Sequence, residues 1–594
     1  MARVFIEPIG VTVEIADQAT LLDAVTSAAV DLRTDCHGRG TCGKCLVRLG
    51  TGGFSEPTEV EHQKVAREKL MDGWRLACQT RPLSARVSIE VRQAQGRRRI
   101  PTASHLRGGA VRPLVRQETV GFAPATLADP RADAERVASA LGVRELRLGA
   151  IRRLPDVLRA GDFRALVTRY GREVIDVEGA DAEPRAFGAA VDVGTSKIIA
   201  YLFDLRDGRA VDQEAVENPQ MRYGEDVVTR MTQAVHHDRL GELTAAVREG
   251  INGLLATLCA RQEIEARHIY DMVVVGNTVM HHLVLGVSPL GMSAAPFAPA
   301  LSAPLTVRAA ELGLDMNPEG GVHLPPPIAG FVGSDCLAVI AATRLAGKRR
   351  PALAVDIGTN TEVVVAAGGR IVVTSAASGP AFEGYQMTCG MKAVEGAIDR
   401  VRLSADGEPQ RVETVGGREP LGLCGSGVVD VLAGLSAAGV VDAGGRLQPH
   451  PRVRQSAAGD GLEYVLTEGA GGDIVVTQHD VRNLQLAKGA IATAWTLLLE
   501  DAGLDPGDLR HVYVAGAFGN YLDRDHALAI GLLPPVPRER VEFVGNAAGV
   551  GAQMALVDGR ARRRMATLRR RLTFLDLATN SDFHEVFTGK LTFV

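Results

Sequence analysis

The sequence contains no run of eighteen apolar residues, and its formal net charge is only −4 over 594 residues. The first absence argues against a transmembrane helix, because about 20 mainly apolar residues are needed to span a bilayer. The near balance of charge provides no general attraction to nucleic acid or to a membrane surface. We therefore expect neither as a partner.

Residues Met1–Pro8 carry charges where an export signal has its apolar core, so we expect no signal peptide. Eight cysteines in a chain of this length fit a reduced cytoplasm rather than an oxidising compartment. Aromatic residues make up only 4% of the chain and 66 residues are glycine, which favours a turn-rich α/β protein. The length predicts several domains, about four by the usual domain size.

Four cysteines have a distinctive spacing. Cys36, Cys42 and Cys45 lie within ten residues with three glycines between them, and Cys78 follows after 32 residues (78 − 45 − 1). Three thiolates from one loop and a fourth from a distant segment are what a [2Fe–2S] cluster requires. Glycine lets such a loop take positive φ angles and point backbone N–H groups at the sulfurs. The remaining cysteines are scattered and are expected in the core: Cys259, Cys336, Cys389 and Cys424.

The spacing C-x5-C-x2-C with a distant fourth cysteine resembles the adrenodoxin-like branch of the plant-type ferredoxins. The alternative is a structural zinc site, which four cysteines also make. Zinc ribbons use two CxxC pairs, however, and here only Cys42 and Cys45 have that spacing. The expected cluster ligands are Cys36, Cys42, Cys45 and Cys78.

Residues 1–92 are expected to form a ferredoxin-like β-grasp domain around this loop. Alternating apolar residues predict an N-terminal hairpin, and helical periodicity follows it. The expected elements are a hairpin of Val4–Ile6 and Val11–Ile15, a helix at Leu21–Val30, a strand at Cys45–Leu49, a charged helix near Glu59–Met71 and a strand at Val87–Val91.

Residues 93–116 lose hydrophobic periodicity and accumulate Arg, Gly and Pro, which predicts a linker. Its composition, with the Arg97–Arg99 run, favours a solvated, flexible basic tether. The alternative is a tether that also lets the first domain swing between electron donor and acceptor. Residues 117–184 are expected to form a small α/β middle domain in which no chemistry is evident. Its predicted elements are helices at Ala132–Leu141 and Leu154–Arg159 and strands around a turn in Thr168–Val177.

A short motif then occurs twice. Asp192-Val-Gly-Thr and Asp356-Ile-Gly-Thr each stand between two apolar strands, 164 residues apart (356 − 192). A repeat at domain-sized spacing indicates a duplicated fold. A Gly-Thr turn directs backbone N–H groups and a hydroxyl toward a phosphate. An Asp at each strand end is suited to hold hydrated Mg²⁺ or to position water.

These turns resemble the two phosphate motifs of the superfamily that joins actin, hexokinase, acetate kinase and the heat-shock chaperone ATPases. A third turn, with Gly516 and Gly519, is placed as the adenosine motif is, although Ala517 replaces the usual second glycine. The resemblance implies a ribonuclease-H-like ATPase domain at 185–594, with halves at about 185–350 and 351–594, that binds ATP with Mg²⁺. It assigns catalytic roles to Asp192 and Asp356 and phosphate binding to Gly194, Thr195, Ser196, Lys197, Gly358, Thr359 and Asn360.

Three further stretches, in this order behind a ferredoxin domain, resemble the reductive activators of corrinoid proteins: Asn218–Val227, Val275–His282 and Ser378–Gly384. The resemblance covers essentially the whole chain and implies a multidomain α/β and α+β enzyme. Such an enzyme passes one electron through a [2Fe–2S] cluster to the Co(II) corrinoid of a methyltransferase corrinoid protein, restoring Co(I) at the expense of ATP. The resemblance also implies a ferredoxin or flavoprotein reductase as electron donor, and a homodimer.

The sequence is also compatible with other functions. One is a small-molecule kinase with a regulatory ferredoxin domain, and another is an ATP-driven activator of a different low-potential enzyme. The activators of 2-hydroxyacyl-CoA dehydratases carry their cluster on cysteines of the ATPase domain, whereas the well-spaced cysteines here lie in the ferredoxin domain. A non-enzymatic, actin-like scaffold that tethers an electron carrier is the remaining alternative.

A few residues could be either functional or structural. His281 and His282 are candidates for metal ligands, but packing or surface positions explain them more simply. Glu383 is either a base near a phosphate or a capping carboxylate. The runs Arg562–Arg564 and Arg569–Arg571 are expected to form the solvated face of a helix, with docking onto an acidic partner as the alternative.

Overall fold

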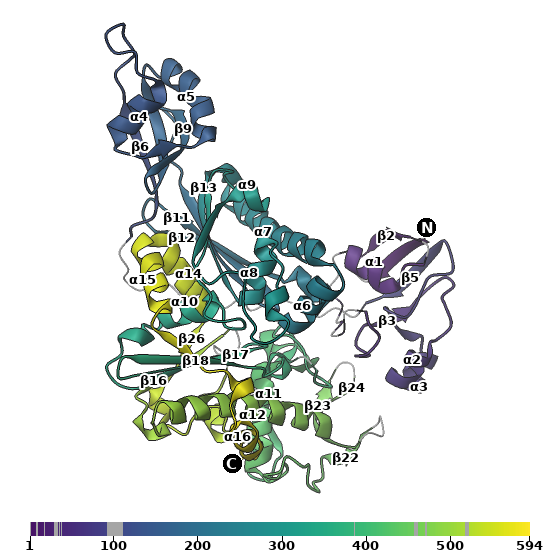
Figure 1. Ribbon diagram of the computed structural model, residues 1–594. Coiled ribbons are helices and arrows are strands. Elements are labelled where there is room, and N and C mark those ends of the chain that lie inside the picture. Colours follow the sequence, from purple (N-terminus) through teal and green to yellow (C-terminus); the bar gives the residue numbers. More distant parts are fainter. Residues whose placement is uncertain are drawn as a thin grey trace.

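The computed structural model describes residues 2–7, 10–16, 18–28, 32, 34, 36, 38–91, 111–384, 386–456, 461–469, 472–516 and 522–593. Figure 1 shows a small N-terminal domain (purple) beside a large body that contains two sheets, and a second small module (blue) that projects from one end of this body. Within the described residues, no helix is long and apolar enough to cross a membrane.

The N-terminal domain is a five-stranded sheet in the order β2-β1-β5-β3-β4. β1 pairs antiparallel with β2, which confirms the predicted hairpin, and parallel with β5. Alternation along β1 places Val4 and Ile6 in the core. This is the expected β-grasp arrangement. Its elements are β1 Ala2–Glu7, β2 Val11–Ile15, α1 Leu21–Ser27, β3 Leu46–Leu49, α2 Glu59–Lys64, α3 Arg67–Met71, β4 Trp74–Leu76 and β5 Arg86–Glu90.

The single charged helix expected near Glu59–Met71 is divided into α2 and α3. Val65 stands between them with an extended backbone (φ −117°, ψ 127°). Its side chain is buried in the core of the domain. A β-branched residue fits the extended conformation well, so burying Val65 there ends the first helix.

The middle module is a four-stranded sheet, β6-β8-β9-β7, whose core is completed by α4 and α5. β6 already begins at Val115, so the last two residues of the segment expected to be a linker pair with β8. The Arg97–Arg99 run lies outside the described residues. The elements are β6 Val115–Gly121, α4 Asp133–Leu141, β7 Glu145–Leu146, α5 Leu148–Ala160, β8 Arg164–Tyr170 and β9 Glu173–Gly179.

Two six-stranded sheets form the body, and five strands of each follow the same order. The first sheet is β12-β11-β10-β13-β15 with β14 at its end, and the second is β18-β17-β16-β25-β26 with β27 beside β18. In each, an antiparallel hairpin is followed by a parallel strand that pairs with the first strand of the hairpin. The duplication predicted from the repeated Asp-x-Gly-Thr motif is therefore present in the fold.

The strands of the first sheet are β10 Phe187–Val193, β11 Lys197–Asp204, β12 Arg209–Glu217, β13 Ile269–Gly276, β14 Leu305–Arg308 and β15 Gly321–Leu324. Those of the second are β16 Ala352–Asp356, β17 Thr361–Ala367, β18 Arg370–Ala376, β25 His511–Ala515, β26 Val541–Gly545 and β27 Leu572–Phe574. The central strands are almost continuously apolar and buried, as expected of strands that are covered on both faces.

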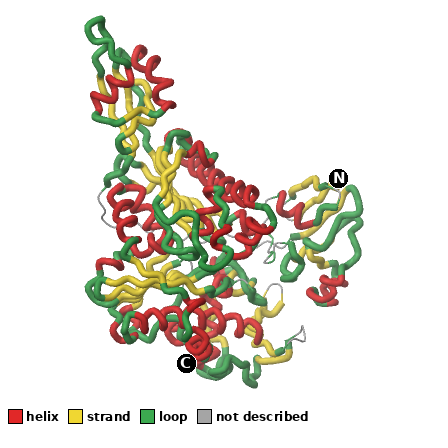
Figure 2. The backbone as a smooth tube through the Cα atoms, in the orientation of Figure 1, coloured by secondary structure: helices red, strands yellow, loops and turns green. Residues whose placement is uncertain are grey.

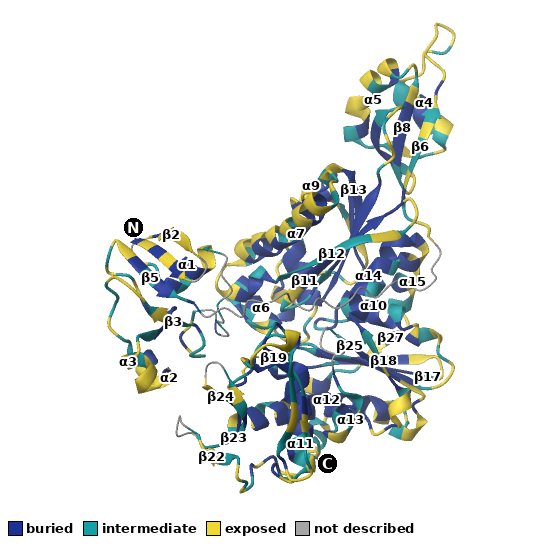
Figure 3. Ribbon diagram, turned by 180° about the vertical axis from the view of Figure 1, so that it is seen from behind, coloured by how far each residue is buried: buried dark blue, intermediate teal, exposed yellow. Residues whose placement is uncertain are grey.

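Helices α10 (Ser334–Ala342) and α14 (Ala547–Val557) lie between the two sheets, as Figures 1 and 2 show. They approach so closely that a Cβ at Gly551 would lie 2.4 Å from the carbonyl oxygen of Ala338. Although α14 comes late in the chain, it packs on β10 and β13 of the first sheet. Figure 3 shows both helices as largely buried. The two halves of the body therefore share one core.

The remaining helices flank these layers, with α7 against the first sheet and α12 against the second. They are α6 Val227–His236, α7 Leu240–Gln262, α8 Thr278–Leu285, α9 Ala309–Leu312, α11 Gly425–Ala437, α12 Gln478–Asp501, α13 Arg524–Ala529, α15 Gly559–Arg569 and α16 Phe583–Lys590. Two small sheets contain β19 Ala397–Leu403, β20 Pro409–Thr414 and β21 Gly422–Leu423, and β22 Val453–Gln455, β23 Leu462–Gly469 and β24 Gly472–Thr477.

The middle module is attached to the body through buried polar side chains. Arg562 of α15 forms an ion pair with Asp271 of β13 and donates a 2.8 Å hydrogen bond to the hydroxyl of Tyr170 in the module. Only 5% of the Arg562 side chain is exposed. The prediction of a solvated arginine face is therefore wrong for Arg562, whereas Arg563 and Arg564 are exposed as expected.

Candidate functional sites in the cysteine loop and between the two hairpins

The four cysteines of the N-terminal domain lie together as two pairs. The Sγ atoms of Cys45 and Cys78 are 3.3 Å apart, and the thiols of Cys36 and Cys42 hydrogen-bond to one another. Cys45 directly precedes β3 and Cys78 follows β4, and these two strands pair antiparallel. That pairing brings the distant fourth cysteine to the loop.

The loop has the backbone that its glycines were expected to allow. Gly38, Gly40 and Gly43 have φ angles of +89°, +76° and +69°. A Cβ at Gly40 would lie 2.8 Å from the side-chain nitrogen of Gln79, and this nitrogen approaches the sulfur of Cys78 at 3.5 Å. A larger residue at position 40 would therefore displace a donor from the sulfur.

Hydrogen bonds between the thiols of each pair shift the pKa values of the four cysteines. The bond from Cys42, assisted by the backbone N–H of Thr41, lowers the pKa of Cys36 to about 4, while the pKa of Cys42 is raised. In the other pair, the bond from Cys45 lowers the pKa of Cys78 to about 7, and the pKa of Cys45 is raised. Hydrogen bonding within each pair therefore favours the loss of a proton and the thiolate form, which binds metal.

The arrangement in pairs bears on which metal the cysteines fit. A structural zinc ion needs four ligands around one point, whereas a [2Fe–2S] cluster shares four cysteines between two irons. Across the described residues, no three His, Cys, Asp or Glu side chains converge to hold a single ion. The two thiol pairs match the division of four cysteines between the two irons of a [2Fe–2S] cluster.

Glu61 holds the segment before Cys78 in place, a role that the sequence did not reveal. Its buried carboxylate accepts two hydrogen bonds from Arg75 (2.8 and 2.9 Å) and one from the N–H of Leu76 (2.9 Å). Burial alone would raise the pKa of Glu61, but the Arg75 guanidinium lowers it. Glu61 is also the N3 residue of the capping box that Thr58 begins. The spacing of Thr58 and Glu61 could have located the box, but not the contact with Arg75.

Lys44 connects the cysteine loop to the body of the protein. Its Nζ atom donates to the carbonyl oxygens of Thr388 (2.7 Å) and Met387 (3.4 Å). The N–H of Thr388 in turn donates to the Asp480 carboxylate in the first turn of α12 (2.8 Å). Figure 3 shows the N-terminal domain beside β24, the strand that leads into α12. Cys45 follows Lys44 directly, so this contact places one cysteine pair next to the body.

One carboxylate joins the two Asp-x-Gly-Thr turns. Glu383 accepts a hydrogen bond from the hydroxyl of Ser196 in the first turn (3.0 Å) and another from the hydroxyl of Thr359 in the second (2.9 Å). The two turns belong to different sheets, so Glu383 bridges the halves of the body. We call residues 194–197, 357–360 and Glu383 the hairpin site.

The carbonyl oxygens of the first turn are engaged by buried side chains. Asn218 donates to the carbonyl of Gly194 (2.8 Å), and Arg230 donates to that of Thr195 (2.6 Å). Among the described residues, the N–H groups of Thr195 and Ser196 donate no hydrogen bond. Consecutive unpaired N–H groups of this kind form an anion-binding nest.

The second turn is braced in the same manner. The Ser378 hydroxyl donates to the carbonyl of Gly358 (3.2 Å), and the N–H of Gly379 donates to that of Thr359 (3.0 Å). The N–H groups of Thr359 and Asn360 have no acceptor within the part of the chain that the structure describes. Both turns therefore offer donors for phosphate oxygens.

Four carboxylates lie close to one another at this site. Asp192 and Asp356 end strands β10 and β16, Asp335 is in the first turn of α10, and Glu362 is in β17. Burial raises the pKa of Asp192 to about 6 and, together with the neighbouring carboxylates, raises that of Asp335 to about 7 and that of Asp356 to about 8. Such raised values show that the site favours a proton or a cation.

The two ends of the site differ in how a carboxylate is satisfied. In the first sheet, the amide of Asn546, the N-cap of α14, donates to Asp192 (2.8 Å). In the second sheet, the neighbouring residue comes from α10 instead of α14. It is Asp335, whose carboxylate lies near that of Asp356. Two carboxylates need a proton or a cation between them. Mg²⁺ is usually held by one or two carboxylates, with water and phosphate completing its shell, so it fits this end.

Part of the third predicted motif lies against the second turn. Gly516 follows β25 with φ +101°, and a Cβ there would lie 2.3 Å from the carbonyl oxygen of Ile357 and 3.2 Å from a carboxylate oxygen of Asp356. Only glycine fits this approach. Gly519 and Ala517 lie outside the described residues. Lys197 is exposed at the first residue of β11.

The adjacent histidines of α8 are buried in the body. Nε2 of His281 lies 2.8 Å from the hydroxyl of Ser334, and Nδ1 of His282 lies 2.8 Å from the carbonyl oxygen of Thr278. Burial lowers the pKa of His281 to about 3. Both residues are therefore packing residues, which agrees with the simpler of the two interpretations.

Family models match four successive segments of the chain. They are the 2Fe-2S iron-sulfur cluster binding domain at residues 4–83, the RACo linker region at 104–184, the RACo middle region at 187–348, and the C-terminal domain of RACo, the ASKHA domain, at 350–594.

Known relatives match either nearly the whole chain or about half of it. The corrinoid activation enzyme RamQ of Eubacterium limosum is 30% identical over 97% of this chain and 96% of its own length. The [Co(II) methylated amine-specific corrinoid protein] reductase of Methanosarcina barkeri is 28% identical over 46% of this chain and 51% of its own. A solved structure of a reductive activator for a corrinoid, iron-sulfur protein superposes with a TM-score of 0.76 at 32% identity, covering 100% of this chain and 98% of the other. The chain belongs to the RACo family of reductive activators of corrinoid proteins.

Proposed function

We propose that this chain uses ATP to pass one electron, through a [2Fe–2S] cluster, to the Co(II) corrinoid of a methyltransferase corrinoid protein and so restores Co(I). The observation that carries the proposal is the short segment from Glu383 to Thr388. Glu383 joins the two turns of the hairpin site, and five residues later Thr388 accepts the hydrogen bond from Lys44 beside Cys45. The candidate nucleotide and cluster sites are thus linked by a few residues of chain.

Such a link suits an electron transfer that is unfavourable for an ordinary ferredoxin. Plant-type clusters have potentials of about −400 mV, and each further 100 mV costs about 2.3 kcal/mol for one electron. We take binding of the Co(II) protein to raise the potential of the cobalt, and ATP to drive its release. ATP can do so only by binding one state of this protein more tightly than the other.

In this proposal Cys36, Cys42, Cys45 and Cys78 hold the cluster, which when bound supplies one electron at a time. The chain's own contribution is to direct N–H groups and the Gln79 amide at the sulfurs. Hydrogen bonds to the sulfurs tune the potential of such clusters. Lys44 holds the loop against the body.

At the hairpin site, Asp192 and Asp356 are the proposed catalytic carboxylates. Asp356 and Asp335 hold hydrated Mg²⁺, and Asp192, oriented by Asn546, positions water. Gly516 and Gly519 lie on the adenosine side. The proposed phosphate contacts are Gly194, Thr195, Ser196, Lys197, Gly358, Thr359 and Asn360.

The remaining partners are also proposals. The electron donor is a ferredoxin or a flavoprotein reductase, the working unit is a homodimer, and the compartment is the cytoplasm. The segment with Arg97–Arg99 acts as the tether that lets the N-terminal domain leave the body to meet its donor. The contact between Lys44 and Thr388 is then one of two positions of this domain.

Metal analysis tests the cluster separately from activity. The full chain, purified without oxygen, is expected to contain about two iron and two sulfide per chain. Cys78→Ser should lose both, while Cys259→Ser, in a buried cysteine of α7, should keep them. Finding one zinc ion per chain instead of iron would contradict the assignment of a [2Fe–2S] cluster. The activity is tested by measuring ATP-dependent formation of Co(I). If no Co(I) forms when ATP is present, the proposed function is wrong.

A further inference from the structure

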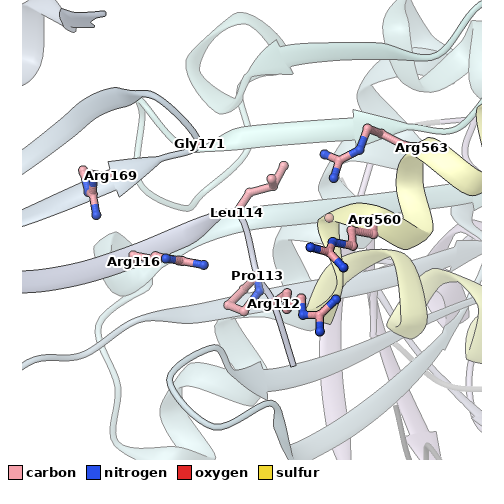
Figure 4. A pocket seen from close by; sticks show the side chains of 9 residues that line it. Arg112, Pro113, Leu114, Arg116, Arg169, Gly171, Arg560 and Arg563 are labelled. Carbon is pink, nitrogen blue, oxygen red and sulfur yellow. The ribbon is translucent and has the colours of Figure 1, made fainter. Parts of the chain in front are cut away.

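A second charged site lies away from both the cysteine loop and the hairpin site. A hollow of about 270 Å³ opens where the middle module meets the start of α15, and Figure 4 shows the side chains around it. In Figure 4, Arg116 and Arg560 extend toward each other from opposite walls. We call it the arginine pocket, and its lining is Arg112, Pro113, Leu114, Arg116, Arg169, Gly171, Gly559, Arg560 and Arg563.

Most of the positive charge in this pocket is not neutralised by the protein. Arg169 pairs with Glu118, yet its Nε is buried without an acceptor. Within the described residues, four guanidinium groups have neither a hydrogen-bond nor an ion-pair partner: those of Arg112, Arg116, Arg560 and Arg563. Like charges gathered around one hollow repel unless an anion lies between them.

The carboxylate of Asp558, the N-cap of α15, is already engaged. Asp558 accepts from the N–H of Arg560 (2.9 Å) and from the side chain of Arg564 (2.8 Å). The pocket also lies at the N-terminus of this eleven-residue helix, which begins at Gly559. The positive end of the helix dipole therefore adds to the guanidinium groups and favours an anion at the same place.

The volume of the pocket and the geometry of its arginines indicate which class of ligand it can bind. Pockets for drug-sized ligands usually measure about 300–1,000 Å³, so this hollow is suited to a smaller group. The planar fork of arginine matches the oxygens of phosphate and binds them in pairs. We propose that the arginine pocket binds a small phosphate-class anion, either pyrophosphate or the diphosphate end of a larger molecule, independently of the nucleotide at the hairpin site.

The bound anion would act on the junction between the middle module and the body. Arg169 and Gly171 flank Tyr170, and Arg560 and Arg563 lie close to Arg562 in α15. Tyr170 and Arg562 form the hydrogen bond that attaches the module. An anion held by both groups of arginines spans the same junction and stabilises it.

Calorimetric titration of the full chain with pyrophosphate tests this assignment. Ser196→Ala with Thr359→Val removes the two hydroxyls of the hairpin site and weakens that site, and all further variants are compared in this background. In this background, Arg560→Ala with Arg563→Ala should weaken pyrophosphate binding at least tenfold. Arg570→Ala with Arg571→Ala removes the same charge about 15 Å along the helix axis, and should change binding less than twofold. Arg116→Ala, on β6, is a second variant outside α15.

Two further titrations identify the source of the anion. Binding of ADP in the same background, lost with the pocket arginines, would indicate that the diphosphate of a larger molecule is accepted. Binding of pyrophosphate without ADP would indicate the free anion. Equal affinity in the pocket and control variants, or no binding to the parent, would overturn the proposal. Arginine-dependent binding of a polyglutamate peptide but not of pyrophosphate would also overturn it, in favour of an acidic protein surface.

Discussion

The Nζ atom of Lys44 lies 2.7 Å from the carbonyl oxygen of Thr388. Lys44 belongs to the cysteine loop, and Thr388 is fixed at the N-terminus of α12, five residues after Glu383. In the proposed function, a change in how Glu383 holds the two hairpins is passed through this contact to the domain that carries the cysteines.

Removing the Lys44 ammonium should weaken docking of the N-terminal domain without affecting the cluster. A hydrogen bond from a charged donor contributes about 1.5–3 kcal/mol, so Lys44→Ala should slow cobalt reduction about tenfold. The visible spectrum and iron content should not change. Lys69→Ala, in the exposed part of α3, is the matched control. Equal rates for the two variants would show that this contact is not used.

Replacing Glu383 should uncouple the two turns. Glu383→Ala removes both acceptors and should lower ATP-dependent turnover at least tenfold, whereas Glu383→Gln keeps one carbonyl acceptor and should be intermediate. The exposed Glu419→Gln should behave as wild type. The measurement is the steady-state ATPase rate with and without the corrinoid protein. An unchanged rate in Glu383→Ala would contradict a bridging role.

Asp356→Asn should separate stability from magnesium binding. The pKa of Asp356 is raised to about 8 because its charge is buried beside other carboxylates. A neutral amide of the same shape removes this unfavourable buried charge. The free energy of unfolding of the nucleotide-free protein should therefore rise by about 1 kcal/mol. Thermal unfolding without ligand should therefore shift upward in the variant.

The same variant should lose the Mg²⁺-dependent part of nucleotide binding, which titration with and without the ion would measure. Asp406→Asn, in an exposed turn, should change neither property. A variant that is less stable than wild type and still binds Mg²⁺ with nucleotide would show that Asp356 has a purely structural role.

The buried pair of Glu61 and Arg75 should give the N-terminal domain an acid-sensitive component of stability. The pKa of Glu61 is lowered in the folded protein, so its contribution is complete above the unfolded pKa, about 4.3, and is lost as pH falls through the folded value. Glu61→Gln should cost about 3 kcal/mol at neutral pH. The difference from wild type should shrink below about pH 4.

Thermal loss of the cluster's visible circular dichroism reports this stability at each pH. Glu56→Gln, at an exposed position just before α2, controls for the loss of charge. If the Glu61→Gln difference stays constant down to acid pH, the ion pair is not its source.

What the sequence could predict was local. The cysteine spacing led to two thiol pairs, formed by one loop and the distant Cys78, and the repeated Asp-x-Gly-Thr motif led to two sheets of matching order. Contacts between residues far apart in the sequence could not be predicted. Three such hydrogen bonds join Ser196 to Glu383, 187 residues apart, Asp192 to Asn546, 354 apart, and Lys44 to Thr388, 344 apart. Residues of the same types occur throughout the chain, and nothing in their neighbours marks these partners.

The prediction was also wrong for one buried charge, in a run of consecutive arginines. Arg562 stands in a run of three arginines, which normally indicates a solvated helix face. Its partners Tyr170 and Asp271 come from two other parts of the chain. Val65 similarly breaks an apparently continuous helix because the core accepts its side chain.

The most direct test is to follow the absorption spectrum of a corrinoid protein held as Co(II) after adding this chain, a low-potential donor and ATP. We expect the Co(I) spectrum to appear with ATP. It should not appear with Cys78→Ser, and it should appear only slowly with Lys44→Ala. If no Co(I) forms with the intact chain and ATP, or if Cys78→Ser supports the same rate, then the cluster does not deliver the electron and the account is contradicted.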